Sequence, residues 1–435
     1  MTCTCMKNIL DKLQKIDKDY YSLLVNIGQV AESEKQKAYL VGGMVRDLLL
    51  GFENLDIDIV VENDAKLLAD ALVKKFPNCE LSAKHDRFHT AKVIFDLNKK
   101  KIPIDLASTR QEIYEHSAAL PTVKVSDLKK DLYRRDFTIN ALAISILPSE
   151  FGEVVDLFNG LIDLKNKKIK ILHNLSFIDD PTRMIRAIRF AAKLGFEIEE
   201  YTQGLLKEAI DSKQFDNLIE KIRGDRVKIE IRYLFNLPNI EDAIKRFFES
   251  GVYRMVDTSL RGSKATETIP NKFTQRDRDC FAPKGARNDI TNQWLIYLAL
   301  IMKDLTSEQQ EKTMKNLQMT GDEIKIIQCA LQAYEKLQGK NIDSIIVYRT
   351  LKDLSLESIL IVKLLKPSIN DLINEYIEKT SKIKLEITGQ DLISIGIPSG
   401  KKIGETLEKV LEIKIRNPGM KKEDEIKEVK KLLNL

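Results

Sequence analysis

Hydrophobic and polar positions change their period along the chain, and the first third shows both helix-like and strand-like patterns. Apolar residues at helical spacing predict one or two helices over Met6–Ala31. Short apolar or alternating runs predict four strands, over Ala38–Val41, Leu55–Val61, Thr90–Phe95 and Ile102–Ala107. Between them, Met44–Leu50 is predicted to be a helix that ends at the capping residue Gly51, and Ala65–Phe76 a second helix. The pattern of the first roughly 150 residues therefore fits an α/β or an α+β fold, and our prediction is α+β, with a small mixed sheet and helices.

Beyond Asn166 the apolar spacing is almost entirely helical, and β-branched alternation is scarce. The predicted helices are Phe177–Leu194, Gln203–Ala209, Arg226–Leu234, Ile240–Phe248, Thr291–Met302, Glu308–Met319, Asp322–Leu337 and Ser355–Leu365. The polar segment Ser259–Asn288 is predicted to be a loop or linker, and Pro367 with Lys384–Gly404 marks a joint before a basic helical C-terminus. The expected parts are an N-terminal helical extension (1–31), an α+β head (32–160), and an all-α neck (161–235), body (236–340) and tail (341–435).

The composition is that of an ordinary globular chain, with 43% hydrophobic and 31% charged residues among 435. The longest apolar runs, such as Trp294–Met302, fall short of the roughly 20 residues that cross a membrane, so no membrane partner is expected. The N-terminus lacks the pattern of a secretory signal, and a cytoplasmic location is expected. The formal net charge is +5, and cations cluster in Lys99–Lys101, Lys129–Arg135, Arg183–Arg189 and Arg223–Lys228. Such runs are usually solvated faces, so composition alone leaves nucleic-acid binding open.

Cysteine and histidine spacing does not predict a zinc site. Cys3 and Cys5 lack a second pair of ligands and are expected to be free thiols near the N-terminus. His85 and His89 flank a predicted loop, and no further Cys or His pair completes a set of four ligands around them.

Two glycines and two aspartates in the predicted head carry the candidate chemistry. Gly42 and Gly43 join a strand to a helix, where backbone amides can approach an anion, and Arg46 in the first turn could contact a phosphate. Asp56 and Asp58 are two positions apart in a predicted strand, so both carboxylates face the same side. Adjacent carboxylates repel unless a cation neutralises them, and Mg²⁺ prefers oxygen ligands. A plain tight turn and a solvated acidic face are the alternatives, but the order of these features favours a phosphate site beside a metal site.

Two further features leave alternatives open. Asp105, in the strand Ile102–Ala107, could face the same metal ions or could be an ordinary acid at a strand end. Arg183, Arg186 and Arg189 recur every three residues and cover about a third of a helix circumference. They could line a pocket, or they could form a solvated basic face behind a helix-capping aspartate.

These segments resemble the polymerase-β-type nucleotidyltransferase superfamily, specifically the class II tRNA nucleotidyltransferases (CCA-adding enzymes) and their bacterial poly(A) polymerase relatives. Four further segments are similar to family motifs and follow in the expected order: Asp131–Ala143 (DLYRRDFTINALA), Asp179–Phe190 (DDPTRMIRAIRF), Ile222–Lys228 (IRGDRVK) and Ile387–Leu392 (ITGQDL). The resemblance spans most of the chain and implies a catalytic nucleotidyltransferase head followed by helical domains.

The resemblance also implies roles for individual residues. Catalysis would depend on Asp56, Asp58 and Asp105, with Mg²⁺ held by Asp56 and Asp58. Nucleotide binding would involve Gly42, Gly43, Arg46, Arg135, Asp136, Asn140, Asp180, Arg183, Arg186 and Arg189. Of these, Gly43 and Arg46 would hold the triphosphate, and Arg135 and Asp136 the phosphate and ribose. Asp180 and Arg183, three positions apart on one predicted helix and therefore neighbours, would distinguish the base edges of CTP and ATP.

The implied activity is template-independent addition of C and A to the 3′ end of tRNA by a two-metal mechanism. Addition of CC only or of A only fits the same motifs, and an inactive RNA-binding protein is the alternative from another class. Poly(A) polymerases tend to carry Gly-Arg-Arg-Phe where this chain has Lys84–Phe88, which argues against that activity. Many relatives have Phe-Gly-Thr where this chain has Phe88, His89 and Thr90. The helical remainder would bind tRNA, and no oligomeric state is predicted.

Overall fold

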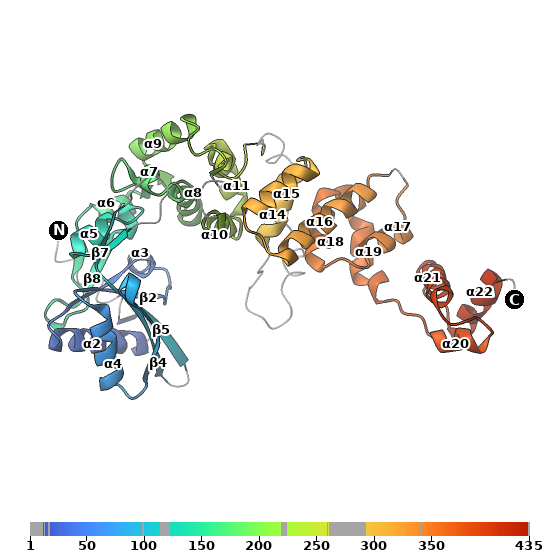
Figure 1. Cartoon of the computed structure of the whole chain (residues 1–435), viewed down its shortest axis with the longest axis horizontal. Helices are drawn as coiled ribbons and strands as arrows, with labels where there is room; N and C mark the ends of the chain where they lie inside the picture. The colour runs from blue at the N-terminus through green and yellow to red at the C-terminus, as the bar shows by residue number, and fades with distance from the viewer. Residues whose placement is uncertain are drawn as a thin grey trace. The chain divides into compact units, whose positions relative to one another are not determined.

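The structure is a computed structural model that describes residues 12, 14, 15, 18–97, 100–113, 122–218, 224–258, 260, 293–339 and 341–433. The chain divides into two compact units, Met1–Thr258 and Ser259–Leu435 (Figure 1). Several predictions fall outside the described residues: the start of the helix Met6–Ala31, Cys3 and Cys5, part of the motif Ile222–Lys228, and nearly all of the linker Ser259–Asn288. The finer domain boundaries at 31, 160, 235 and 340 stay predictions.

The first unit is built on a seven-stranded sheet with the order β3-β4-β5-β2-β1-β8-β9. Its strands are β1 (Lys37–Val41), β2 (Ile57–Glu62), β3 (Cys79–His85), β4 (Thr90–Leu97), β5 (Lys100–Ser108), β8 (Leu142–Ser145) and β9 (Val154–Asp156). β2 and β5 are parallel, whereas the other neighbouring pairs are antiparallel. The sheet is therefore mixed, which confirms the α+β fold. β3 escaped prediction because Cys79 is its only buried residue, so it lacks the alternation that marks a strand.

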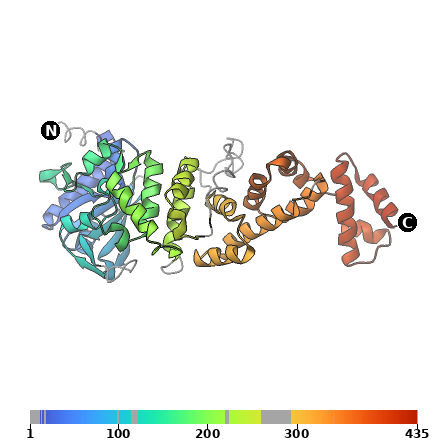
Figure 2. The same cartoon turned by 90° about the horizontal axis from the view of Figure 1, so that it is seen from above.

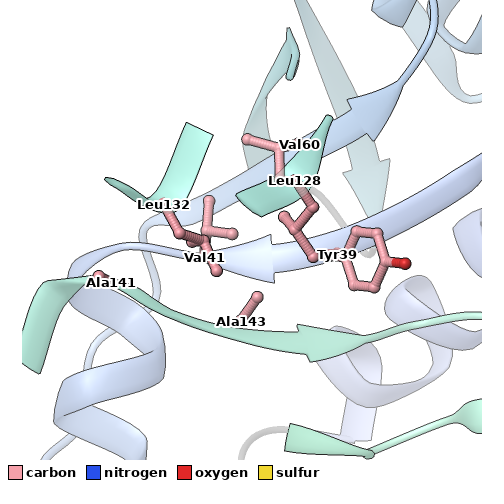
Figure 3. Packing of buried hydrophobic residues seen from close by; sticks show 7 residues of the cluster. All are labelled: Tyr39, Val41, Val60, Leu128, Leu132, Ala141 and Ala143. Carbon is pink, nitrogen blue, oxygen red and sulfur yellow. The ribbon is translucent and has the colours of Figure 1, made fainter. Parts of the chain in front are cut away.

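Helices cover the sheet on both faces. They are α2 (Lys18–Ser33), α3 (Gly43–Leu50), α4 (Ala65–Lys75), α5 (Leu128–Tyr133) and α6 (Gly160–Lys165), and a separate hairpin is formed by β6 (Arg110–Ile113) and β7 (Thr122–Val125). α3 ends at Gly51, whose φ of 81° is left-handed, as its capping role requires. α5 packs Leu128 and Leu132 onto Tyr39, Val41 and other apolar residues of β1, β2 and β8 (Figure 3). Asp58 lies two positions before Val60 on this same face of β2, so the α5 side of the sheet carries the candidate site.

The described remainder of the first unit contains the short parallel strands β10 (Lys168–Ile169) and β11 (Glu197–Ile198). It also contains the helices α7 (Ser176–Asp179), α8 (Thr182–Leu194), α9 (Glu200–Asp211), α10 (Gly224–Phe235) and α11 (Ile240–Glu249). The single helix predicted over Phe177–Leu194 is wrong, because the chain leaves the helical conformation at Asp180, whose φ and ψ are −134° and 93°. The cause is Pro181, which disfavours a helical residue before it and starts a new helix. Asp180 and Arg183 therefore do not share a helix.

The described part of the second unit contains helices and no strands (Figure 2). They are α14 (Gln293–Met302), α15 (Ser307–Asn316), α16 (Gly321–Lys336), α17 (Ser344–Leu351), α18 (Leu356–Leu365), α19 (Asn370–Glu378), α20 (Gly389–Ser394), α21 (Lys401–Arg416) and α22 (Lys422–Leu433). Threonine capping boxes start α15, α16 and α20. The predominance of helices expected beyond the head is confirmed, although β10 and β11 form a short parallel pair in the neck that was expected to be all-α. Among the described residues, none of the helices has the length and apolarity needed to cross a membrane.

Candidate active site

A cavity of about 650 Å³ in the first unit collects residues from the sheet, α3, α8 and α10. It contains every residue singled out in the sequence except Asp105, namely Gly42, Gly43, Arg46, Asp56, Asp58, Arg135, Asp136, Asn140, Asp180, Arg183, Arg186 and Arg189. Its wall also includes residues that the sequence did not single out: Met44, Asn54, Glu112, Arg134, Thr182, Phe190, Lys193, Arg226, Ile229 and Glu230. Segments more than 150 positions apart thus meet in one charged cavity.

The glycine turn between β1 and α3 brings the backbone against a carboxylate. Gly42 has a φ of 79°, which favours glycine, and a Cβ built there would lie 3.1 Å from Asp58 Oδ2. A Cβ on Gly43 would lie 3.4 Å from Asn54 Nδ2. Side chains at these positions would therefore crowd the cavity just where the amide groups of the turn approach it.

Asp56 and Asp58 are neighbouring acids on the wall of the cavity. Asp58 lies in β2, whereas Asp56 precedes the strand by one residue, so the predicted strand starts too early. In the described part of the chain, neither carboxylate has a hydrogen-bond or ion-pair partner. Loss of hydration, followed by the negative charges of Asp105 and Asp56, raises the pKa of Asp58 to about 6, although Arg135 opposes this shift. The pair therefore concentrates negative charge that the neighbouring side chains compensate only in part.

Asp105 lies beside Asp58 but in a different environment. The two residues are aligned across the parallel strands β2 and β5. Both line a second cavity of about 460 Å³ over the sheet, where Lys92 Nζ lies 3.0 Å from the Asp105 carboxylate. Asp105 thus already has a cationic partner, and its catalytic role stays a prediction.

Asp136, Asn140 and Arg46 form a buried chain of hydrogen bonds. Arg46, only 3% exposed, donates to Asn140 Oδ1 at 2.7 Å and pairs with Asp47 at 2.6 Å. Asn140 in turn donates to Asp136 Oδ1 at 2.9 Å. Because the Arg46 guanidinium is held by these partners, its position at the cavity wall is fixed before any ligand binds.

The arginines of α8 are compensated by two acids. Arg186 donates to Asp136 Oδ2 at 2.6 Å and to Glu230 at 2.7 Å, and Arg189 donates to the other oxygen of Glu230 at 2.8 Å. Burial would raise the pKa of Asp136, but the charge of Arg186 and hydrogen bonds from Asn140 and Arg186 hold it below its ordinary value. The open alternative of a solvated basic face is therefore wrong, because these arginines face acids inside the cavity.

Asp180 and Arg183 both reach the cavity, but they bind other residues instead of each other. Asp180 accepts hydrogen bonds from the backbone and hydroxyl of Thr182 and pairs with Arg226 at 2.8 Å. Arg183, which is buried, donates to Ser176 Oγ at 2.8 Å and to the Arg134 carbonyl at 2.6 Å. Asp180 is thus a helix-capping residue and a cavity residue together.

A second arginine pair approaches from α5. Asp131, fully buried, accepts from Arg134 at 2.8 Å and from Arg135 at 3.0 Å, and Arg134 also binds Glu112 of the β6–β7 hairpin at 2.9 Å. The Nε atom of Arg135 is buried without a hydrogen-bond partner. Arg135 lines both cavities, so a donor without a partner lies beside the unpaired aspartates.

His89 stands where many relatives have the glycine of Phe-Gly-Thr, and its backbone keeps a conformation typical of glycine. Its φ is 50°, in the left-handed region where glycine is favoured. The chain keeps the turn with a histidine, and His85 ends the neighbouring strand β3.

Comparisons with known proteins identify the family of the chain. Residues 38–170 match the Poly A polymerase head domain, and residues 288–426 match domain 2 of tRNA nucleotidyltransferases. The A-adding tRNA nucleotidyltransferase of Geobacter sulfurreducens is 32% identical over 93% of this chain and 46% of its own length. The chain thus spans about half the length of the curated A-adding relatives that it matches.

Solved structures match along their whole length. The CCA-adding enzyme of Thermotoga maritima in complex with tRNA has 30% identity over 98% of both chains and a TM-score of 0.77. Structures of a CCA-adding enzyme with CTP and with ATP have TM-scores of 0.78, also at 30% identity, and cover at least 98% of each chain. This chain belongs to the tRNA nucleotidyltransferase family that includes the CCA-adding enzymes.

Proposed function

We propose that this protein adds nucleotides from CTP and ATP to the 3′ end of tRNA without a nucleic-acid template and releases pyrophosphate. The observation that carries the proposal is the single cavity that joins the glycine turn, the unpaired Asp56 and Asp58, and the arginines of α8. The tRNA, CTP and ATP complexes of similar enzymes support the substrates. A cytoplasmic site of action is part of the proposal, because the relatives act on tRNA.

The donor set fits a hard divalent cation such as Mg²⁺. Asp56 and Asp58 supply carboxylate oxygens, and neither has an ion-pair partner in the described part of the chain, although Arg135 and Lys92 partly offset the charge of Asp58. Among the described residues, no group of three or more His, Cys, Asp or Glu side chains could share an ion, so substrate phosphates and water would complete the coordination. When bound, Mg²⁺ would lower the pKa of the RNA 3′-hydroxyl and neutralise the triphosphate.

The protein's own groups position the substrates. In this proposal the amides of the glycine turn, Arg46 and Arg135 bind the triphosphate. Asp136 and Asn140 orient the ribose. Asp180 and Arg183 meet the base edge, with Arg186 and Arg189 beside them. The 3′-hydroxyl then attacks the α-phosphate, a new P–O bond forms, and pyrophosphate leaves. Fixing both reactants in one cavity supplies most of the rate enhancement.

Addition of the terminal A alone is the second candidate. The first three curated relatives are A-adding enzymes at 32–36% identity, whereas the matched CCA-adding enzymes of Latilactobacillus and Lactobacillus are 26% identical. The first two of these relatives are about twice as long as this chain, and the third matches over 52% of each chain, so their activity does not transfer directly.

The test uses three tRNAs that end before the first C, before the second C and before the terminal A. CTP and ATP are supplied singly and together with Mg²⁺, and the products are separated on a sequencing gel. We expect extension of at least one tRNA, and the pattern distinguishes CCA, CC-only and A-only addition. Absence of incorporation into all three tRNAs would overturn the proposal, and long A tails would replace it by poly(A) synthesis.

A further inference from the structure

α10 has a buried face and an outward face with different chemistry. Its inward residues Val227, Ile231 and Leu234 are buried, and Glu230 holds the α8 arginines. The outward face carries three exposed residues one helical turn apart, which we call the outer ridge of α10: Ile229, Arg232 and Tyr233. Ile229 is 48% exposed and Tyr233 58% exposed. Two large apolar side chains are therefore open to solvent on one side of a helix.

The outer ridge begins at the rim of the active-site cavity. Ile229 itself lines the cavity. The Arg189 guanidinium lies 5.4 Å from the centre of the Tyr233 ring, and its Nε is bonded to Glu230. Tyr233 is thus placed beside the cavity by a cation–π contact with an arginine whose own position is fixed.

The ridge has the chemistry of a surface for single-stranded RNA. Unpaired bases stack on aromatic rings and on guanidinium planes, and nearby cations attract the phosphates. Tyr233 and Ile229 offer the apolar surface, while Arg189, Lys193 and Arg226 of the cavity wall and Arg232 of the ridge supply the cations. Two apolar side chains are too few for a stable protein interface, which buries roughly 20–30 residues on each side.

We propose that the outer ridge of α10 is a stacking surface for the unpaired bases at the 3′ end of the acceptor RNA. This proposal rests on the proposed nucleotidyl transfer, since an RNA end that reaches Asp58 must leave the cavity over its rim. A base stacked on Tyr233 would orient the RNA end without contacting the incoming nucleotide. The predicted signature is therefore a selective loss of RNA affinity when the ring is removed.

The test uses the full-length protein and a tRNA that lacks its terminal A and carries 2-aminopurine as its last base. Stacking quenches 2-aminopurine fluorescence, so the wild type should quench it on binding without any nucleotide. Tyr233→Ala should lose this quenching and raise the KM for tRNA about tenfold, as expected for loss of one base-stacking contact. The KM values for CTP and ATP should change less than about twofold. Tyr233→Phe, which keeps the ring, should resemble the wild type.

Tyr201 of α9 is the matched control, because it is also 58% exposed and does not line the cavity. Tyr201→Ala should keep both the quenching and the KM for tRNA. Unchanged quenching and an unchanged KM for tRNA in a folded Tyr233→Ala protein would overturn the proposal. A raised KM for CTP or ATP instead would assign the ring to the nucleotide. A wild type that quenches the probe but adds no nucleotide would refute the proposed function and leave the stacking surface standing.

Discussion

The two ends of the active-site cavity handle negative charge in opposite ways. At the β2 end, Asp58 has no ion-pair partner within the described chain, and the pKa of its carboxyl is raised to about 6. At the α8 end, Asp136 accepts two hydrogen bonds from Arg186, and the pKa of its carboxyl is lowered. Loss of hydration disfavours ionisation of both carboxyls, although Asp58 keeps more exposed surface than Asp136, so the opposite directions of the two shifts come from their charged partners.

This difference separates the charges that the protein neutralises with its own side chains from those that a bound ligand would neutralise. The row Asp136, Arg186, Glu230 and Arg189 is mutually compensated, so it is pre-organised in the free protein. The pair Asp56 and Asp58 has no ion-pair partner in the described chain, and Arg135 and Lys92 offset the charge of Asp58 only in part, so the pair can attract a cation from solution. In our proposal the first region selects and orients the nucleotide, and the second awaits the metal.

The largest effect should follow removal of the unpaired carboxylates. Asp58→Ala or Asp56→Ala should reduce nucleotide incorporation by about a thousandfold or more, since metal-ion catalysis supplies several kcal/mol. Binding of tRNA, measured by filter retention, should persist. Asp70→Ala is the control, because Asp70 is an exposed acid on α4 that pairs with Lys84. Nucleotide incorporation at the wild-type rate in either variant would contradict the proposal that Asp56 and Asp58 bind the metal.

Breaking the compensated end should instead affect stability. Asp136→Asn removes a buried charge that Arg186 needs, and loss of one member of a buried pair costs about 3 kcal/mol. Because the folded pKa of Asp136 lies below the unfolded value near 3.8, this stability is present above about pH 4 and is lost as the pH falls further. Urea unfolding of the variant and the wild type at pH 7 and below pH 4 measures both statements. Equal stability of the variant and the wild type at pH 7 would contradict the inference that the pair of Asp136 and Arg186 stabilises the fold.

The sequence predicted the membership of the cavity better than its internal contacts. Gly42, Asp58 and Arg135 belong to contiguous motifs whose order and spacing are visible in one dimension. Glu230 has no such signal, because an acid on a helix surface is ordinary until its partner is known. Only the packing of α10 against α8 shows that it holds two arginines. Side-chain partners from distant segments are a property of the tertiary fold.

The same limit explains the error around Asp180. Apolar spacing continues across Pro181, so periodicity predicts one helix, whereas the proline separates α7 from α8. The strand order of the sheet was also beyond the sequence, since β3 is almost wholly exposed and β9 has three residues. Fold class survived these local errors because it depends on the succession of patterns along the chain and tolerates shifted boundaries.

Glu230→Gln should have a smaller effect on activity, because it changes only one acid at the α8 end of the cavity. The amide keeps the shape of the side chain but removes the charge that fixes Arg186 and Arg189. Loss of charge-assisted hydrogen bonds should lower kcat/KM for CTP or ATP by about tenfold, with tRNA binding preserved. Glu249→Gln, on the exposed side of α11, is the control. Wild-type kinetics in Glu230→Gln would show that Arg186 and Arg189 do not need the negative charge of Glu230.

The smallest effect is a gain in stability, in contrast to the loss expected for Asp136→Asn, and it comes from a substitution of Asp58. Asp58→Asn should stabilise the metal-free protein at pH 7, because ionising Asp58 is unfavourable in the folded state. Its folded pKa of about 6 lies above the unfolded value of 3.8, so the folded state binds more protons between these values. Wild-type stability therefore falls as the pH rises through this window, whereas that of Asp58→Asn does not. If Asp58 were fully buried, the difference in the free energy of unfolding would be about 3 kcal/mol. Because the side chain is exposed to solvent, we expect about 1 kcal/mol.

Thermal unfolding at pH 4 and pH 7 should show equal stabilities of the two proteins at pH 4 and a more stable variant at pH 7. Added Mg²⁺ should stabilise only the wild type and close the gap, because a ligand that binds the folded state alone shifts its stability. A variant that is less stable than the wild type at pH 7 without metal would mean that Asp58, like Asp136, is compensated by the protein itself.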